Sequence, residues 1–248
     1  MYSKPDAPLS IGGVLDDGFR LAKASYVKLL LLAFVASLLG QLPNLAFVGD
    51  DPEALTEFPI QAAFVTLLSA LISGVFYGAI LARLGAITEG GDMSLIDALY
   101  VGMRRFPALI GCGICFIVVL SLGYILLVIP GIILTVSLGF AFYLVIIDKE
   151  GPISALKTSH RLVWGNWWRT TALITVIVFV SFVFVFIFGF VLGLAQVVLP
   201  PLIGVFLFAL VGTLVYPVSY AMSLSVLNDL KLRKTGGDLA SRMDDLGS

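Results

Sequence analysis

The chain has 248 residues, of which 59% are hydrophobic and 12% are charged, and its formal net charge is −1. Its mean hydropathy of +1.06 lies far above that of soluble domains, in which about a quarter of the residues are charged. This composition excludes a soluble globular protein, offers no basic surface to nucleic acid, and supplies too few cysteines for a disulfide framework. The bilayer is therefore the expected solvent.

The first apolar run extends from about Ala24 to Val48, after a polar N-terminal segment. It is too long for the apolar region of a signal peptide, so we interpret it as a retained first span. The acidic loop GDDPEALTEFP separates it from a second run at residues 60–82. Small residues recur at four-residue intervals in the second run, which predicts close helix packing, with a permeation path as the alternative: Ala70, Gly74, Gly78 and Ala82.

Two longer uncharged stretches follow, Pro107–Ile147 and Thr170–Asn228. Each is at least twice the ~20 residues that one crossing requires, so each predicts two spans with a turn between them. Proline followed by glycine or a second proline indicates those turns, at Pro130–Gly131 and Pro200–Pro201. The expected fold is all-α, with six transmembrane helices arranged as three hairpins.

All 15 Lys and Arg residues fall outside the three predicted hairpin turns. By the positive-inside rule this distribution places both termini in the cytoplasm. We expect one transmembrane domain, with a short, polar and mobile cytoplasmic tail at residues 229–248.

A similar amphipathic segment precedes each hairpin: IGGVLDDGFR, LIDALYVGMRR and PISALKTSHR. The aligned positions hold Leu15, Leu99 and Leu156, then Gly18, Gly102 and Ser159, and then Arg20, Arg104 and Arg161. Amphipathic helices of this kind lie in the membrane interface. The pattern predicts a pseudo-threefold repeat of one interfacial helix plus one hairpin, with units at about 9–86, 93–147 and 151–228.

The third of these segments leads into a cluster of all three tryptophans, Trp164, Trp167 and Trp168. Tryptophan favours the interface because its ring is apolar and its N–H binds water, so we predict that these residues anchor the chain there. The only histidine, His160, aligns with Phe19 and Met103, which favours a packing role over a metal or proton site. Cys112 and Cys115 have the spacing of a redox pair, but small packing residues are the favoured interpretation.

No set of residues suited to catalysis is evident. One histidine cannot complete a Ser/His/Asp set or a paired-histidine metal helix, and no phosphate-binding glycine loop occurs. We therefore predict a protein that is not an enzyme and that has no catalytic residues, cofactor or metal site.

The stretch from Pro130 to Arg169 resembles the YciC-like bacterial inner-membrane proteins, an uncharacterised family. The likeness rests on the Pro-Gly pair, on an acidic residue at the end of the fourth span and on the segment that follows it: Asp148, Ala155, Ser159, Arg161, Leu162, Trp164, Gly165, Asn166 and Trp168. More distantly, the chain resembles the membrane domain of some glycerophosphodiester phosphodiesterases, but it lacks their catalytic domain. The resemblance implies a multi-pass inner-membrane protein and little about chemistry.

Two functions remain open from the sequence. The leading hypothesis is membrane or envelope organisation through contacts with lipids, with other copies or with other inner-membrane proteins. The alternative is a transporter or channel-like pathway for a small anion or lipid, in which Arg20, Arg104 and Arg161 contact an anion or a lipid head group. A polar cavity between several spans would favour the alternative.

Overall fold

The computed structural model describes residues 2–47, 59–195 and 200–247, and within these ranges every secondary-structure element is a helix. The helices are α1 (Ile11–Phe47), α3 (Pro59–Thr88), α4 (Leu95–Leu126), α5 (Val128–Leu138), α6 (Ala141–Ile147), α7 (Pro152–Val163), α8 (Trp167–Ala195) and α9 (Pro201–Gly247). Six segments are long and apolar enough to cross a membrane, with α5 and α6 together forming one of them. The acidic loop between the first two predicted spans lies outside the described residues.

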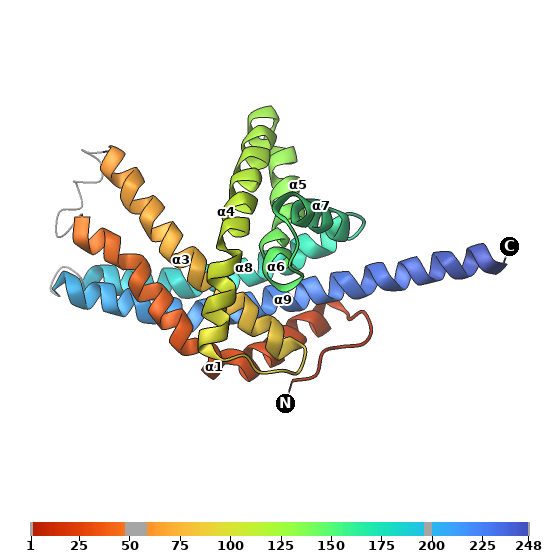
Figure 1. Cartoon of the computed structure of the whole chain (residues 1–248), viewed down its shortest axis with the longest axis horizontal. Coiled ribbons are helices and arrows are strands. Elements are labelled where there is room, and N and C mark those ends of the chain that lie inside the picture. The colour runs from red at the N-terminus through yellow and green to blue at the C-terminus, as the bar shows by residue number, and fades with distance from the viewer. Residues whose placement is uncertain (1, 48–58, 196–199, 248) are drawn as a thin grey trace.

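The helices pair as α1 with α3, α4 with α5, and α8 with α9. These pairs diverge from a shared region, so that the α4–α5 pair stands well apart from the α8–α9 pair (Figure 1). Helix α1 also packs extensively along α9, and α3 packs along α4, which joins the pairs to one another.

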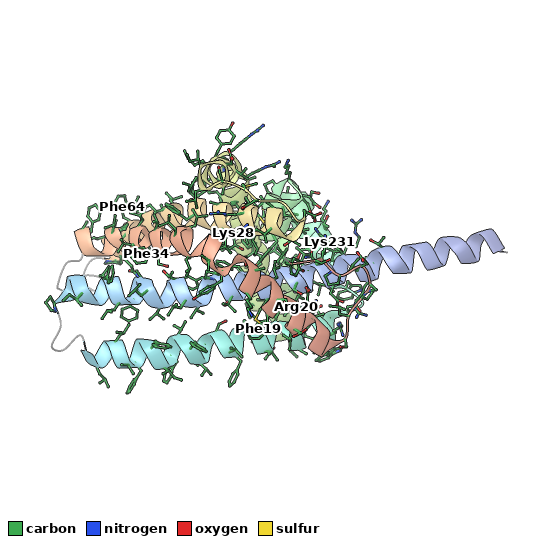
Figure 2. The ribbon with its side chains drawn as sticks, turned by 90° about the horizontal axis from the view of Figure 1, so that it is seen from below. Phe19, Arg20, Lys28, Phe34, Phe64 and Lys231 are labelled. Atoms are coloured by element: carbon green, nitrogen blue, oxygen red, sulfur yellow. The ribbon has the colours of Figure 1, made fainter. Side chains whose placement is uncertain are left out.

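The core lies in the shared region, which we call the base. The largest fully buried side chains are almost all found there: Val14, Leu21, Leu29, Leu81, Leu84, Leu144, Ile146, Leu173, Leu224, Leu227 and Leu230. Arg20 and Lys231 lie at the base, whereas Phe34 and Phe64 lie nearer the far ends of the hairpins (Figure 2). The far ends expose apolar side chains, which suits contact with lipid tails.

The amphipathic segments differ from the expected separate interfacial helices. The first two are continuous with the following spans, in α1 and in α4, and α4 runs without a break through Pro107, which stands at the junction. Only the third is separate, since Gly165, with a φ of +94°, ends α7 and lets the chain turn into α8. Of the three amphipathic segments, α7 alone forms the separate helix that the sequence predicts.

The turn predicted at Pro130–Gly131 is also displaced. The break between α4 and α5 falls at Leu127, which is extended at φ −165° and ψ 150°. Pro130 and Gly131 lie in the first turn of α5, where the missing N–H of proline costs little because the first four N–H groups of a helix have no partner within it. Proline therefore marks the start of the second helix and not the turn itself.

The third predicted turn borders residues 196–199, which lie outside the described part of the chain. Pro201 is the first residue of α9, and the Pro200 carbonyl accepts the N–H groups of Ile203 (2.9 Å) and Gly204 (3.3 Å). Proline at the first helical position is favourable because its φ suits the helix.

The aligned small residues of the three amphipathic segments all pack against another hairpin. A Cβ on Gly18 would lie 2.9 Å from Met222 Cα on α9, and one on Gly102 would lie 2.9 Å from Ala79 N on α3. The Ser159 hydroxyl donates to the Ser137 carbonyl on α5 at 2.7 Å. Small side chains permit these close approaches, while the pseudo-threefold repeat itself remains a prediction.

Helix α9 continues through the boundary at residue 229 as far as Gly247. Asp229 and Leu230, which belong to the predicted tail, are both buried at the base. The packed part of the chain therefore extends further than the run of uncharged residues suggested.

Candidate functional site

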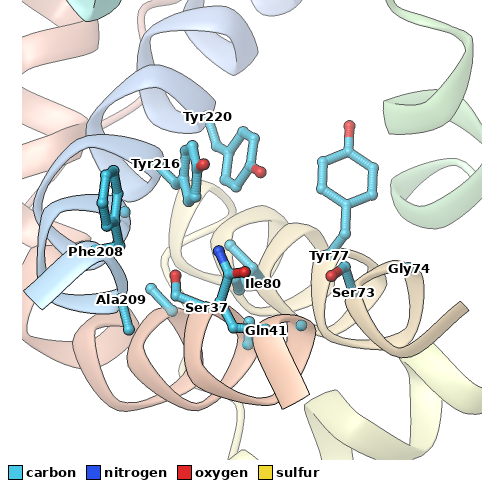
Figure 3. A pocket seen from close by; sticks show the side chains of 14 residues that line it. Ser37, Gln41, Ser73, Gly74, Tyr77, Ile80, Phe208, Ala209, Tyr216 and Tyr220 are labelled. Carbon is cyan, nitrogen blue, oxygen red and sulfur yellow. The ribbon is translucent and has the colours of Figure 1, made fainter. Parts of the chain in front are cut away.

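A polar cavity of about 380 Å³ lies between α1, α3 and α9 (Figure 3). Every residue that lines it belongs to one of the six apolar segments, so the cavity lies between predicted spans. Its lining is Ala33, Ala36, Ser37, Gly40, Gln41, Ser73, Gly74, Tyr77, Ile80, Phe208, Ala209, Gly212, Tyr216 and Tyr220.

The lining is rich in polar groups and contains no charged side chain. Ser37 and Gln41 are one helical turn apart on α1, and their polar atoms point towards the rings of Tyr216 and Tyr220 on α9 (Figure 3). The lining thus offers hydroxyl groups and one amide, which can both donate and accept hydrogen bonds.

The aromatic wall of the cavity is ordered by ring contacts. Tyr77 and Tyr220 meet edge to face with centroids 5.2 Å apart, and Tyr216 stacks with Tyr220 at 6.2 Å. These contacts fix the rings at the geometry that aromatic pairs prefer.

Close approach of the helices also shapes the cavity. A Cβ on Gly212 would lie 2.8 Å from Ser37 Oγ and 2.8 Å from the Tyr216 ring. Ser37 Oγ is buried and has no hydrogen-bond partner among the described residues. A buried hydroxyl without a partner is energetically costly.

We did not identify this cavity from the sequence, although a signal was present. Ser37 and Gln41, Ser73 and Tyr77, and Tyr216 and Tyr220 are pairs at four-residue spacing inside apolar runs. Such spacing places each pair on one helix face. What the sequence lacks is the tertiary packing that brings three such faces together.

A second, apolar groove of about 210 Å³ lies between α8 and α9. It contains one polar contact, in which the hydroxyls of Ser181 and Ser219 lie 2.8 Å apart. These hydroxyls satisfy each other, unlike that of Ser37.

The base holds a buried polar network around Asp17, which is 1% exposed. Its Oδ2 accepts hydrogen bonds from Ser225 (2.7 Å) and Tyr2 (3.1 Å), and its Oδ1 accepts one from Arg20 (3.1 Å). Burial, together with the charge of Asp17, raises the pKa of the Tyr2 hydroxyl. This network joins the N-terminal segment to α1 and α9.

A second buried carboxylate, Asp229, holds the N-terminal segment from the other side. Its Oδ1 accepts the Leu9 N–H at 2.8 Å, and its Oδ2 accepts from Arg169 at 3.2 Å and from Arg233 at 2.9 Å. Both arginines also donate to the Leu9 carbonyl. The peptide groups of Leu9 are therefore paired on both sides, which fixes Leu9 against α8 and α9.

Surface ion pairs surround this cluster. Lys4 pairs with Glu89 and Lys28 pairs with Asp92, at 2.9 and 2.8 Å. The hydrogen bond from Lys28 lowers the pKa of the exposed Asp92 carboxyl. Lys231 binds Asp148 at 2.6 Å and so ties α9 to the end of α6.

The three arginines of the proposed anion or head-group site differ in their surroundings. Arg20 pairs with Asp17 and, at 4.0 Å, with Asp16. Arg104 is exposed on α4, and Arg161 lines a shallow hollow on α7. Within the described residues no contact joins these side chains, so a ring formed by the three stays a prediction.

The aromatic residues near α7 divide between two environments. Trp167 packs inward and donates its indole N–H to the Ile133 carbonyl at 3.3 Å. Trp164 and Trp168 are 58% and 82% exposed. His160 packs against Trp164 with ring centroids 5.2 Å apart. Phe19 and Met103, which align with His160 in the other two segments, are mostly exposed, so the aligned position lies at the surface in those segments.

The small residues of the second span lie partly at the interface with α4. Gly78 and Ala82 are buried, a Cβ on Gly74 would lie 3.0 Å from the Phe106 ring, and Ala70 is exposed. The two cysteines are not joined; Cys112 is buried and Cys115 is partly buried.

Six helical segments, each long and apolar enough to cross a membrane, define an integral multi-pass membrane protein. Residues 56–218 match the uncharacterised protein family UPF0259. The chain belongs to this family, which confirms the resemblance to the YciC-like proteins. The likeness to the phosphodiesterase membrane domain stays a prediction.

The curated relatives are bacterial. A UPF0259 membrane protein of Photorhabdus laumondii is 21% identical over 243 residues, covering 82% of this chain and 95% of the relative. One of Pectobacterium carotovorum is 27% identical over 115 residues, covering 46% of each chain. No solved structure matches the chain.

Proposed function

We propose that this protein is a non-enzymatic component of the bacterial inner membrane that binds the polar end of an uncharged lipid in the cavity between α1, α3 and α9. The observation that carries the proposal is an uncharged but polar cavity placed between three predicted spans. The sequence left open, as its alternative, a transporter or channel-like pathway for a small anion or lipid. The proposal keeps the lipid as the ligand of that alternative.

The lining favours an uncharged ligand. An ion in this position would need a countercharge, and the cavity supplies only hydroxyl and amide groups. A glycerol ester with a free hydroxyl, as in diacylglycerol, offers the matching donor and acceptors, while its tails stay in the bilayer. The volume of about 380 Å³ is near the lower end of ligand pockets and suits a lipid's polar end.

The same lining argues against the anion pathway. Arg20, the labelled arginine in Figure 2, lies at the base and is paired with Asp17, away from the cavity lining. An anion crossing the bilayer through uncharged groups would be costly.

The proposed orientation has both termini in the cytoplasm. It is supported by the basic residues at the base, such as Lys4, Lys28 and Lys231, and by the positive-inside rule. Labelling of cysteines placed at residues 53, 130 and 200 from the periplasmic side tests it, and labelling of any of them only from the cytoplasm would contradict it.

The cavity is tested with a photoreactive diacylglycerol in nanodiscs, and a photoreactive phosphatidylcholine serves as the reference lipid. We expect diacylglycerol crosslinks on α1, α3 and α9, and a several-fold lower yield in the variant S37A/Q41L. The matched control is S181A. It removes a hydroxyl of α8 from the apolar groove between α8 and α9, away from the cavity. Equal yields in the two variants, or no preference over phosphatidylcholine, would reject the proposal.

Membrane organisation remains a second candidate, favoured by one observation. The apolar surface of α8 is almost entirely exposed, with stacked phenylalanines along it, including Phe182, Phe186 and Phe190. This surface could accept another copy or another inner-membrane protein as well as lipid. Chemical crosslinking in intact membranes tests it, and a protein that stays monomeric and without partners would reject it.

A further inference from the structure

Helix α7 has one face fixed by packing. Its buried residues are Ala155, Leu156, Ser159, Leu162 and Val163, and they lie against α4, α5 and α6. The Ser159 hydroxyl bond to the Ser137 carbonyl further fixes the helix. The opposite face is therefore held outward in a defined orientation.

That outward face is basic. Lys157 and Arg161 are exposed, lie one helical turn apart, and line a shallow hollow of about 470 Å³ with Ile153, Ser154 and Thr158. Within the described residues no acidic side chain forms an ion pair with either. Two cations at this spacing can share one phosphate group, since the arginine fork and the lysine ammonium both donate to phosphate oxygens.

The nearest acidic residue in sequence, Glu150, lies beside this hollow and is hydrogen-bonded to two of its lining residues. Its Oε2 accepts hydrogen bonds from Ser154 at 2.7 Å and from Thr158 at 3.0 Å. The Glu150 carboxylate is therefore held by the first turns of α7, and among the described residues it forms no ion pair with Lys157 or Arg161, so both cations can still donate to an external anion.

An exposed aromatic pair adjoins the basic face. Trp164 and Trp168 project from the junction between α7 and α8, and the His160 ring supports Trp164. Tryptophan of this exposure beside basic side chains is typical of the level of the lipid head groups. Arg20, by contrast, has its own buried carboxylate in Asp17 and needs no external partner.

We propose that the outward face of α7 docks on anionic phospholipids, with Lys157 and Arg161 on the phosphate and with Trp164 and Trp168 among the neighbouring head groups. The charge of the face and its adjacent indoles match this one partner. This site is independent of the cavity between α1, α3 and α9.

Intrinsic fluorescence gives a local test, because all three tryptophans of the chain belong to this region. The full chain is reconstituted in phosphatidylcholine vesicles that contain a fixed fraction of brominated phosphatidylglycerol, or the same fraction of brominated phosphatidylcholine. We expect the anionic lipid to quench at least twofold more, and the excess to fall as salt is added.

The variant K157Q/R161Q should lose this excess, whereas K4Q/K28Q, which removes two basic residues with acidic partners, should keep it. Thermal unfolding checks that both variants fold, and R161K/K157R, which keeps the charges, should retain the excess. Equal quenching by the two lipids in the unaltered protein, or equal loss in both double variants, would overturn the proposal. Displacement by millimolar soluble glycerol phosphate would also overturn it, because it would assign the site to a free phosphate ligand.

Discussion

The replacement Asp229→Ala should destabilise the protein more than removal of any surface carboxylate. The Asp229 side chain is 3% exposed and receives hydrogen bonds from two guanidinium groups and from one backbone N–H. Alanine would leave Arg169 and Arg233 close together without a countercharge and would leave the Leu9 N–H without an acceptor.

The size of the effect follows from this geometry. Removal of one partner from a buried ion pair costs about 3–5 kcal/mol, because the remaining charge stays desolvated. The side chains of Arg169 and Arg233 are 20% and 27% exposed, so both regain some hydration, and we expect about 3 kcal/mol. For a chain of this length the loss corresponds to a fall of the melting temperature on the order of 10 °C. Asp229→Asn keeps an acceptor for Leu9 and should lose less.

A thiol-reactive dye supplies the assay. Cys112 is fully buried, so in a Cys115→Ser background the dye should react only as the protein unfolds in detergent. Asp92→Ala is the matched control, because it removes an ion pair of 2.8 Å from an exposed site and should leave the melting temperature nearly unchanged. If Asp229→Ala and Asp92→Ala unfold at the same temperature, the cluster around Leu9 does not stabilise the fold.

Two further predictions use the same preparation. Gly102→Ala should lower the free energy of unfolding by about 1–3 kcal/mol, because the new Cβ would lie 2.9 Å from Ala79 N, a backbone atom that cannot move aside. Gly12→Ala is the control; it has open space around it and should be neutral or slightly stabilising. Equal melting temperatures of the two variants would refute the packing argument. The Lys28 hydrogen bond that lowers the Asp92 pKa contributes stability above the ordinary carboxyl pKa of about 4 and loses it as pH falls through the lowered value. Lys28→Gln should therefore raise the Asp92 pKa in a carboxyl NMR titration, and an unchanged pKa would contradict this assignment.

The number of spans could be predicted because charge is so costly in a bilayer. The uncharged runs that contain Pro130 and Pro200 are each long enough for two crossings, and the structure has apolar helices of the required length in those places. The position of the first break was wrong by three residues, since proline can occupy the first turn of a helix as readily as the turn before it.

The buried ionic cluster could not be predicted in the same way. Asp17 and Asp229 lie beside basic residues at the ends of apolar runs, where acidic side chains are usually solvated. Their burial depends on the packing of α1 against α9, which joins residues far apart in the sequence. The cavity could not be predicted for the same reason. Gln41 and Tyr216 line one cavity only because α1, α3 and α9 pack together, and the sequence does not show this packing.

The hydrogen bonds between Leu9 and the side chains of Asp229, Arg169 and Arg233 have a consequence for the synthesis of the chain. Leu9 and Asp229 are 220 residues apart, so at a translation rate of ~5–20 residues per second the N-terminal segment waits roughly 10–45 seconds for its partner. During that interval the first helix is already in the membrane, while the carboxylate of Asp17 lacks the hydroxyl of Ser225. The nascent protein therefore lacks these contacts in its N-terminal half until its last helix emerges.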